Sequence, residues 1–212
     1  MITLAIPKGR IFDDVLPLLN KIGIELFESP DLSRKLIVQT KDLNLRLLIV
    51  RATDVPTYVR FGAADMGIVG SDILFETSVD GLYQPVDLKI GACRLSLAAP
   101  EGLDFDALIL DGKKIRVATK YPKQTLEFFS TKRVQVDIIK LYGSMELSPL
   151  VGLSDVIVDL VSTGKTLSAN GLVEIEVIKS ITSRLIVNKA SFKMKNNLLD
   201  KYIYALSSAK KG

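Results

Sequence analysis

Short apolar runs alternate with stretches of helical periodicity along most of the chain. Residues 2–6 and 156–161 are apolar runs of strand length, rich in β-branched side chains. The stretch 10–22 instead repeats its apolar side chains at helical spacing, on the face formed by Val15, Leu18, Leu19 and Ile22. This alternation predicts an α/β fold, in which ligands bind outside the carboxyl ends of the strands.

The same reading assigns elements to the rest of the chain. Further strands are predicted at 36–40, 43–50, 65–69, 115–120, 134–140 and 174–188, and a strand-rich segment at 83–100. The first two are separated by a tight turn and predict a hairpin. Helices are predicted at 53–62, from 71, at 122–132, at 147–152 and from 189 onward. Residues 101–114 are predicted to form a polar connector.

Two α/β lobes are predicted from this order of elements. The first comprises residues 1–91 and 181–212, and the second comprises residues 92–180. The segment 174–188 is long enough to cross back from one lobe to the other. The two crossings predict a hinge with a central cleft between the lobes.

The segment 162–166, Ser-Thr-Gly-Lys-Thr, follows the buried run 156–161 and predicts a phosphate-binding turn at the start of a short helix. Gly164 permits close approach of the backbone to a ligand, and three hydroxyl groups add donors. Asp155 and Asp159 are placed near the carboxyl end of the strand, where carboxylates suit ribose hydroxyls. A P-loop is not predicted, because that motif requires glycine at the position of Asp159. A strand, turn and helix without a ligand is the alternative interpretation.

Polar residues also follow other predicted strands. Lys8 and Arg10 follow the first strand and Arg51 follows the strand at 43–50, positions that suit an anion or simply a solvated turn. Asp72 is either a helix cap or a site residue. Glu146, at the start of a helix, either compensates the helix dipole or contacts a ligand.

Composition limits the chemistry. The 212 residues contain no histidine and one cysteine, Cys93, and 48% of them are apolar. Histidine-based catalysis and an internal disulfide are therefore excluded, and a structural zinc site is not expected. The net charge of +4 favours anionic ligands, but the cations are scattered and do not indicate nucleic acid. Neither a membrane span nor a signal peptide is predicted, which indicates a cytoplasmic protein.

Four segments resemble the ATP phosphoribosyltransferase family. They are Leu-Ala-Ile-Pro-Lys-Gly-Arg at 4–10, Arg-Ala-Thr-Asp-Val-Pro at 51–56, Lys-Leu-Tyr-Gly-Ser-Met-Glu-Leu at 140–147, and the segment 154–172 around the predicted phosphate turn. The length fits the short form of the family. The resemblance implies the periplasmic-binding-protein type II architecture. It also implies transfer of a phosphoribosyl group from phosphoribosyl diphosphate to N1 of ATP, the first step of histidine biosynthesis.

The resemblance also implies roles for individual residues. The phosphoribosyl diphosphate site would comprise Glu146, Asp155, Asp159, Ser162, Thr163, Gly164, Lys165 and Thr166. The ATP and pyrophosphate site would comprise Lys8, Arg10, Arg34, Arg51, Asp72 and Cys93, with Arg10 and Arg34 as catalytic residues. No metal ligand is assigned to the protein, because Mg²⁺ would bind mainly to the substrate phosphates.

A homodimer is expected for the isolated chain, and a hetero-oligomer with a regulatory subunit that resembles a histidyl-tRNA synthetase. The competing interpretation is a non-catalytic cytosolic protein of the same fold that binds or senses a small anion. Release of pyrophosphate from phosphoribosyl diphosphate and ATP would distinguish the two.

Overall fold

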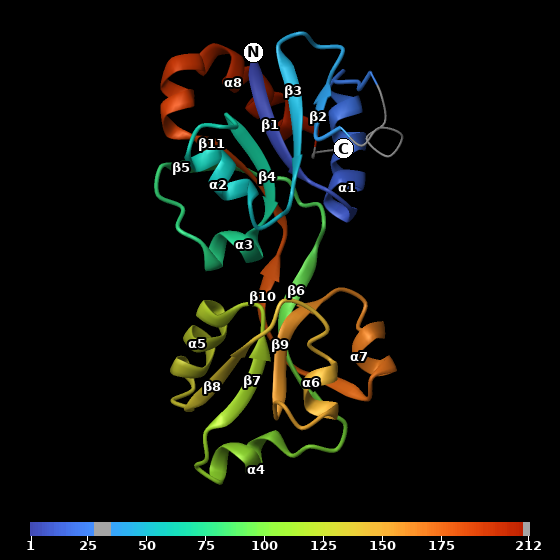
Figure 1. Cartoon of the computed structure of the whole chain (residues 1–212), viewed down its shortest axis with the longest axis vertical. Helices are drawn as coiled ribbons and strands as arrows, with labels where there is room; N and C mark the ends of the chain where they lie inside the picture. The colour runs from blue at the N-terminus through green and yellow to red at the C-terminus, as the bar shows by residue number, and fades with distance from the viewer. Residues whose placement is uncertain (28–34, 210–212) are drawn as a thin grey trace. The chain divides into compact units, whose positions relative to one another are not determined.

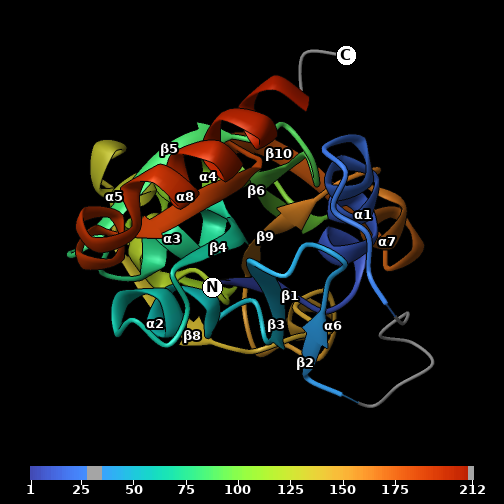
Figure 2. The ribbon, with the colours of Figure 1, turned by 90° about the horizontal axis from the view of Figure 1, so that it is seen from above.

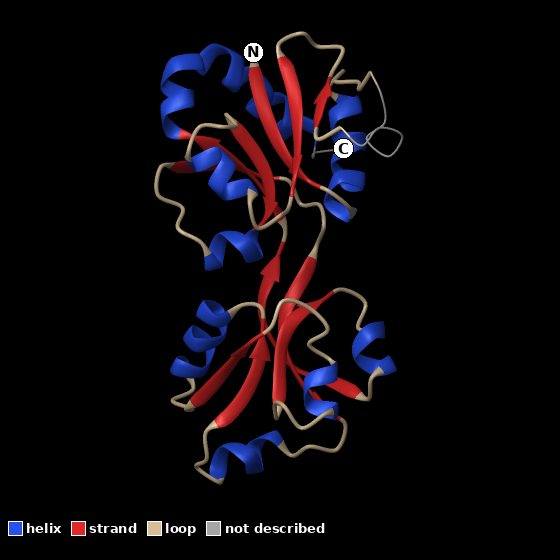
Figure 3. Ribbon diagram, viewed as in Figure 1, coloured by secondary structure: helices blue, strands red, loops and turns tan. Residues whose placement is uncertain are grey.

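The computed structural model describes residues 1–27 and 35–209, and the chain divides into two compact units (Figure 1). Unit 1 comprises Met1–Ala92 and Thr182–Gly212, and unit 2 comprises Cys93–Ile181. The chain therefore passes from one unit to the other twice. Each unit is built on one mixed β-sheet with helices packed against it (Figure 3).

The sheet of unit 1 has six strands in the order β2-β3-β1-β4-β11-β5. Their bounds are β1 (Ile2–Pro7), β2 (Ile37–Gln39), β3 (Leu45–Val50), β4 (Met66–Gly70), β5 (Leu82–Asp87) and β11 (Ser183–Asn188). The three central strands β3, β1 and β4 are parallel, whereas β2, β5 and β11 pair antiparallel with their neighbours. The predicted hairpin of β2 and β3 is present. The carboxyl ends of β1, β3 and β4 consequently share one edge.

Helices cover both faces of this sheet (Figure 2). They are α1 (Arg10–Lys21), α2 (Val55–Arg60), α3 (Ser71–Glu76) and α8 (Lys189–Ala209). The predicted apolar face of α1 is buried at Val15, Leu18 and Leu19, and it packs with α8 on one side of β1. The other side of the sheet is covered by α2 and α3.

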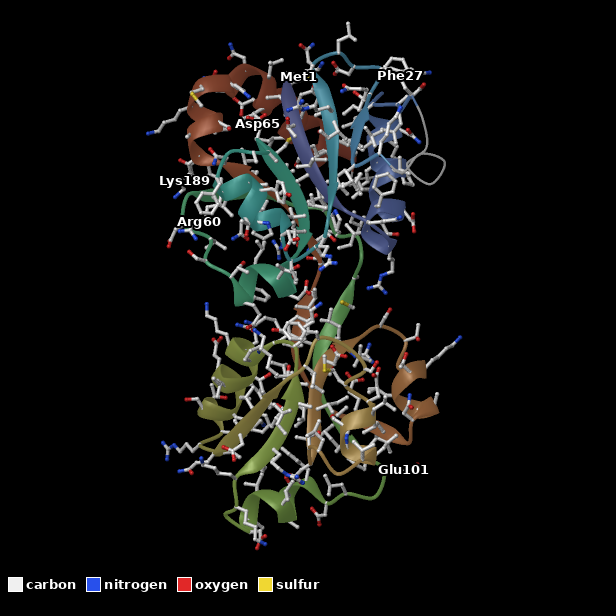
Figure 4. The ribbon with its side chains drawn as sticks, viewed as in Figure 1. Met1, Phe27, Arg60, Asp65, Glu101 and Lys189 are labelled. Carbon is white, nitrogen blue, oxygen red and sulfur yellow. The ribbon has the colours of Figure 1, made fainter. Side chains whose placement is uncertain are left out.

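Asp65, just before β4, ties α8 to the sheet of unit 1 (Figure 4). Its carboxylate accepts hydrogen bonds from the backbone N–H of Thr3 at 2.9 Å and from Lys195 Nζ at 2.8 Å. Lys195 stands where α8 departs from helical geometry, with φ −129° and ψ 28°. The buried carboxylate thereby fixes the kink of α8 against β1 and β4.

The sheet of unit 2 has five strands in the order β10-β6-β9-β7-β8. Their bounds are β6 (Cys93–Pro100), β7 (Ile115–Thr119), β8 (Val136–Lys140), β9 (Val156–Val161) and β10 (Leu172–Ile181). Strands β7, β8 and β9 are parallel, and β6 runs antiparallel to both β9 and β10. The carboxyl ends of the three parallel strands and the start of β6 therefore lie at the same edge.

The helices of unit 2 are α4 (Phe105–Leu110), α5 (Pro122–Thr131), α6 (Leu147–Leu150) and α7 (Lys165–Ala169). One face of the sheet carries an apolar cluster that joins Leu167 of α7 to Met145, before α6, and to Val161 of β9. We call it the α7 face. The opposite face carries α5, because Lys132 and Gln124, at the two ends of that helix, bond side chains of β10.

Two predictions about elements need correction. The segment 101–114 is not only a connector, since α4 lies within it, and Asp104 caps α4 by accepting the N–H of Ala107 at 2.9 Å. The helix was missed because it is short and follows a glycine. The single long strand predicted at 174–188 is two strands, β10 and β11, which belong to different sheets. Among the described residues, no helix has the length and apolar character needed to cross a membrane.

Candidate functional site

Three loops of unit 2 converge because β7, β8 and β9 are parallel and end at one edge of the sheet. They are residues 120–121 after β7, residues 141–146 after β8 and residues 162–164 after β9. Ser162 to Thr166 form the segment that was predicted to bind phosphate, and we call it the phosphate loop. This edge is where open α/β sheets bind their ligands, so the loops are in position to form a site.

The phosphate loop presents donors to solvent. Gly164 is the residue before α7 and has φ 79° and ψ −6°, a left-handed conformation that other residues adopt at a cost. Within the described chain, the N–H groups of Thr163, Gly164 and Thr166 donate to no protein acceptor. Since α7 has only five residues, its dipole is small. The loop therefore offers amide and hydroxyl donors, with little contribution from the helix dipole.

Asp159 and Glu146 lie near this loop. Asp159 is in β9 directly opposite Ser96 of β6, and its Oδ1 accepts the N–H of Leu160 at 2.8 Å. Its side chain shares the α7 face with Val161 because the two residues are separated by one position along the strand. Glu146 immediately precedes α6, which packs near this face. Both carboxylates are half-buried, so they remain accessible to a polar ligand.

Asp155 lies at the other end of β9, which corrects its predicted position. The sequence analysis placed it near the carboxyl end of the strand, but it precedes Val156, the first residue of β9. It is therefore roughly 20 Å along the strand from the phosphate loop. Its Oδ1 and Oδ2 accept hydrogen bonds from Arg116, at 2.7 Å from Nη2. These hydrogen bonds hold the pKa of Asp155 below its ordinary value.

The different positions of Asp159 and Asp155 predict different effects of substitution, on ligand affinity for Asp159 and on stability for Asp155. The resemblance implies phosphoribosyl diphosphate as the ligand, and Asp159→Asn should weaken its binding about tenfold or more, the effect of losing one hydrogen bond to a charged group. Asp155→Asn should leave binding unchanged and lower stability instead, because it leaves Arg116 without its charged partner. Calorimetric titration and thermal unfolding of both variants measure these effects. Equal losses of affinity in the two variants would contradict the assignment.

In unit 1, three cations gather at the edge where β1 and β3 end. Lys8 and Arg10 follow β1, Arg51 follows β3, and the N–H of Lys8 donates to the carbonyl of Val50 at 3.3 Å. Gly9, with φ 93°, allows the chain to turn from β1 into α1. Within residues 1–27 and 35–209, no carboxylate pairs with Lys8, Arg10 or Arg51. Cations at a helix amino terminus are unfavourable by themselves, so a bound anion would relieve this arrangement.

The remaining predicted residues are placed as follows. Asp72 is buried in the first turn of α3, whose N-cap is Gly70. Cys93 is half-buried as the first residue of β6, and Lys165 is exposed at the start of α7. Arg34 lies outside the described residues.

Sequence reasoning missed two cations at the edge in unit 2. Lys120 directly follows β7, just as Lys8 directly follows β1, so the same rule of strand ends could have identified it. Arg94 is the second residue of β6 and bonds the carbonyl of Ser162. No local signal indicates Arg94, because its partners are 68 and 80 residues away in sequence.

Comparison with protein families gives a match over most of the chain. The family model described as HisG: ATP phosphoribosyltransferase matches residues 51–208. The ATP phosphoribosyltransferase of Albidiferax ferrireducens is 58% identical over 209 residues, covering 99% of each chain. That of a Janthinobacterium species is 56% identical over 210 residues, covering 99% of this chain and 96% of the relative.

Solved structures agree. The ATP phosphoribosyl transferase (HisG:HisZ) complex from Thermotoga maritima contains a chain with a TM-score of 0.82 and 33% identity, covering 100% of this chain and 99% of that one. The alkanesulfonate-binding protein SsuA from Xanthomonas axonopodis pv. citri has a TM-score of 0.58 at 12% identity, covering 98% of this chain and 72% of that one. The second likeness shows the fold alone and confirms the predicted resemblance to periplasmic binding proteins.

The family model and these relatives define the chain, with its two α/β units, as a pentosyltransferase. It belongs to the ATP phosphoribosyltransferase family, whose reaction is the first step of histidine biosynthesis. The predicted family and activity are thereby confirmed.

Proposed function

We propose that the phosphate loop of unit 2 binds the 5-phosphate of phosphoribosyl diphosphate. The observation that carries this proposal is the set of unpaired N–H groups on Thr163, Gly164 and Thr166 at the carboxyl end of β9. The hydroxyls of Ser162, Thr163 and Thr166 add donors, and Lys165 adds positive charge. Asp159 accepts hydrogen bonds from the ribose hydroxyls, and Glu146 assists it. Asp155 has no role in this proposal.

In unit 1, the cations Lys8, Arg10 and Arg51 contact the pyrophosphate and triphosphate groups. Arginine suits this role because its planar fork binds two phosphate oxygens at once. Arg10 and Arg34 stabilise the charge that develops on the leaving pyrophosphate. Asp72, and Cys93 at the start of β6 in unit 2, also contact the nucleotide. The support for this assignment is the gathering of unpaired cations where β1 and β3 end.

The reaction joins N1 of the adenine of ATP to C1 of phosphoribosyl diphosphate, and the bond from C1 to the pyrophosphate oxygen breaks. N1 carries a free lone pair, so no strong base is required, and a chain without histidine can catalyse the step. Positive charge develops at C1, as in glycoside cleavage. The residues of this chain then act by positioning the substrates and by stabilising charge.

Magnesium fits this site as a companion of the substrate. Among the described residues, no group of three or more His, Cys, Asp or Glu side chains is arranged to hold a metal ion. Mg²⁺ keeps several waters and binds phosphate oxygens, and when bound it neutralises charge on the pyrophosphate. Asp159 and Glu146 are the carboxylates near the phosphate loop that could contact its waters. The half-buried single cysteine is compatible with a reducing, cytoplasmic location.

A panel of bases tests the substrate assignment. Pyrophosphate release from phosphoribosyl diphosphate is measured with ATP, GTP, free adenine, orotate and hypoxanthine. We expect ATP to be the only compound of the panel that supports pyrophosphate release. The rate of release should depend on the concentrations of both ATP and phosphoribosyl diphosphate. Binding of phosphoribosyl diphosphate without release with any base would instead support a non-catalytic anion sensor.

A regulatory partner is a further part of this proposal. The solved relative is a HisG:HisZ complex, and its matching chain has nearly the same length as this one. We propose that this chain alone is a homodimer, the commonest closed assembly, and that it joins a subunit resembling a histidyl-tRNA synthetase.

Histidine should not inhibit the isolated chain, and adding the partner should raise activity and confer inhibition. Sedimentation of the isolated chain measures its oligomeric state. Initial rates with and without histidine, before and after the partner is added, measure inhibition. Strong inhibition of the isolated chain would contradict it.

A further inference from the structure

Arg94 of β6 connects the phosphate loop to the edge strand β10. Its Nη1 donates to the carbonyl oxygen of Ser162 at 2.9 Å. Its Nε and Nη2 donate to the two carboxylate oxygens of Glu174, at 2.5 and 2.6 Å. The guanidinium group is therefore fixed in a bidentate ion pair on one side and holds the first residue of the loop on the other. Bidentate pairs of this kind impose geometry as well as attraction.

Glu174 is held in position by two further features. Ser96, fully buried in β6, donates its hydroxyl to Oε1 of Glu174 at 2.6 Å. The register of β10 against β6 also shifts between Glu174 and Glu176. Regular alternation would place both glutamates on the same face, but the extra residue turns Glu176 toward α5, where it pairs with Lys132. The bulge therefore leaves Glu174 on the α7 face, directed at Arg94.

The ion pair favours the charged form of both side chains. Hydrogen bonding from Arg94 lowers the pKa of the Glu174 carboxyl, and hydrogen bonding to Glu174 raises the pKa of Arg94. Both side chains are half-buried, which limits competition from water. The contact with Ser162 thus comes from a guanidinium group that stays charged and has little freedom to turn.

The hydrogen bond from Arg94 to the carbonyl of Ser162 also orients the N–H group of Thr163. The peptide unit is planar, so the carbonyl of Ser162 and the N–H of Thr163 point in opposite directions within one plane. Fixing the carbonyl toward Arg94 fixes the Thr163 N–H on the other side. A cationic donor on the carbonyl also polarises the peptide and makes that N–H a better donor.

We infer that Arg94 is a positioning residue for the phosphate loop, aiming the Thr163 N–H at the 5-phosphate without touching the substrate. The inference rests on the proposed function, in which this loop binds phosphoribosyl diphosphate. Glu174, Ser96 and the bulge in β10 serve to orient Arg94. Lysine cannot replace it, because an ammonium group lacks the rigid fork that bonds Glu174 and Ser162 together.

Arg116 provides a matched control at the opposite end of β9. Its guanidinium pairs with both oxygens of Asp155, and its Nη1 donates to the carbonyl of Gly152 at 2.9 Å. Arg94 and Arg116 thus make the same kinds of bonds, one beside the phosphate loop and one remote from it. A loss of stability alone should affect both lysine variants alike.

The test compares Arg94→Lys with Arg116→Lys in the full chain. Arg94→Lys should weaken affinity for phosphoribosyl diphosphate about tenfold, the effect of one hydrogen bond to a charged group. Its KM for phosphoribosyl diphosphate should rise by more than its kcat falls, and its affinity for ATP should not change. The amide resonance of Thr163 should move even without substrate. Arg116→Lys should leave each of these unchanged.

Unchanged affinity in Arg94→Lys, or equal losses in the two lysine variants, would overturn the inference. If Arg94→Lys does not fold, Glu174→Gln keeps the shape of the side chain and should show the same split in kinetic constants. A Gly164→Ala variant separates this inference from the proposed function. Lost binding in Gly164→Ala with normal binding in Arg94→Lys rejects the inference alone. Normal binding in both rejects the proposed function as well.

Discussion

Replacing Gly164 with alanine should abolish productive binding of phosphoribosyl diphosphate while the fold survives. Gly164 has φ 79°, and a Cβ built there meets no atom of the chain within 4 Å. The added methyl group therefore causes no clash within the protein. It forces a left-handed conformation that costs roughly 1–2 kcal/mol for other residues, and it enters the space proposed for the phosphate. We expect the loop to turn away and lose its aligned donors.

Affinity should fall by at least about 100-fold, equal to about 2.7 kcal/mol. Losing two hydrogen bonds to a charged phosphate, each worth roughly 1.5–3 kcal/mol, accounts for this fall. Gly171 is the matched control, since it has φ 66°, lies just beyond α7 and has equally open surroundings. Gly171→Ala should lose a similar amount of stability and bind normally. Calorimetry showing normal affinity in a folded Gly164→Ala variant would reject the role of the loop.

Replacing Arg10 with alanine should slow the chemical step more than it weakens binding. Arg10 begins α1, where no described carboxylate neutralises it. If it stabilises the leaving pyrophosphate, its hydrogen bonds strengthen as negative charge develops. Losing one charge-assisted hydrogen bond in the transition state costs roughly 1.5–3 kcal/mol, a decrease of about 10–150-fold in kcat. Rapid-quench measurement of a single turnover isolates this step from product release.

Arg60 is the control for charge. It is also exposed, but it lies in the last turn of α2, away from the strand ends (Figure 4). Arg60→Ala changes the net charge equally and should leave kcat unchanged. Arg34→Ala should resemble Arg10→Ala if both residues are catalytic. A near-normal single-turnover rate in Arg10→Ala would remove it from the catalytic residues.

Local pattern was sufficient for most elements. Strand β1 was predicted as a continuous apolar run, and all its residues are buried. Helix α1 was predicted because its apolar residues recur at helical spacing, and Val15, Leu18 and Leu19 are buried as expected. The loop after β9 was predicted because a glycine with hydroxyl-bearing neighbours follows a buried strand. These features depend only on residues that are close in sequence.

Other features depend on distant residues. Asp155 was misplaced although the strand was predicted at 156–161, the bounds that β9 has. Because Asp155 precedes that run, it lies at the amino end of the strand, and its assignment near the carboxyl end was inconsistent with the predicted strand itself. Arg94 was missed because its partners Ser162 and Glu174 become neighbours only when β6 pairs with β9 and β10. The bulge that turns Glu174 and Glu176 to opposite faces also has no counterpart in the alternating sequence pattern.

The central claim is that the phosphate loop of unit 2 holds the 5-phosphate. Amide resonances of ¹⁵N-labelled protein during titration with phosphoribosyl diphosphate test it most directly. The largest shifts should fall on Thr163, Gly164, Lys165 and Thr166, and ribose 5-phosphate should reproduce them, whereas inorganic pyrophosphate should not. Shifts confined to the ends of β1 and β3, with the loop after β9 unchanged, would contradict the account.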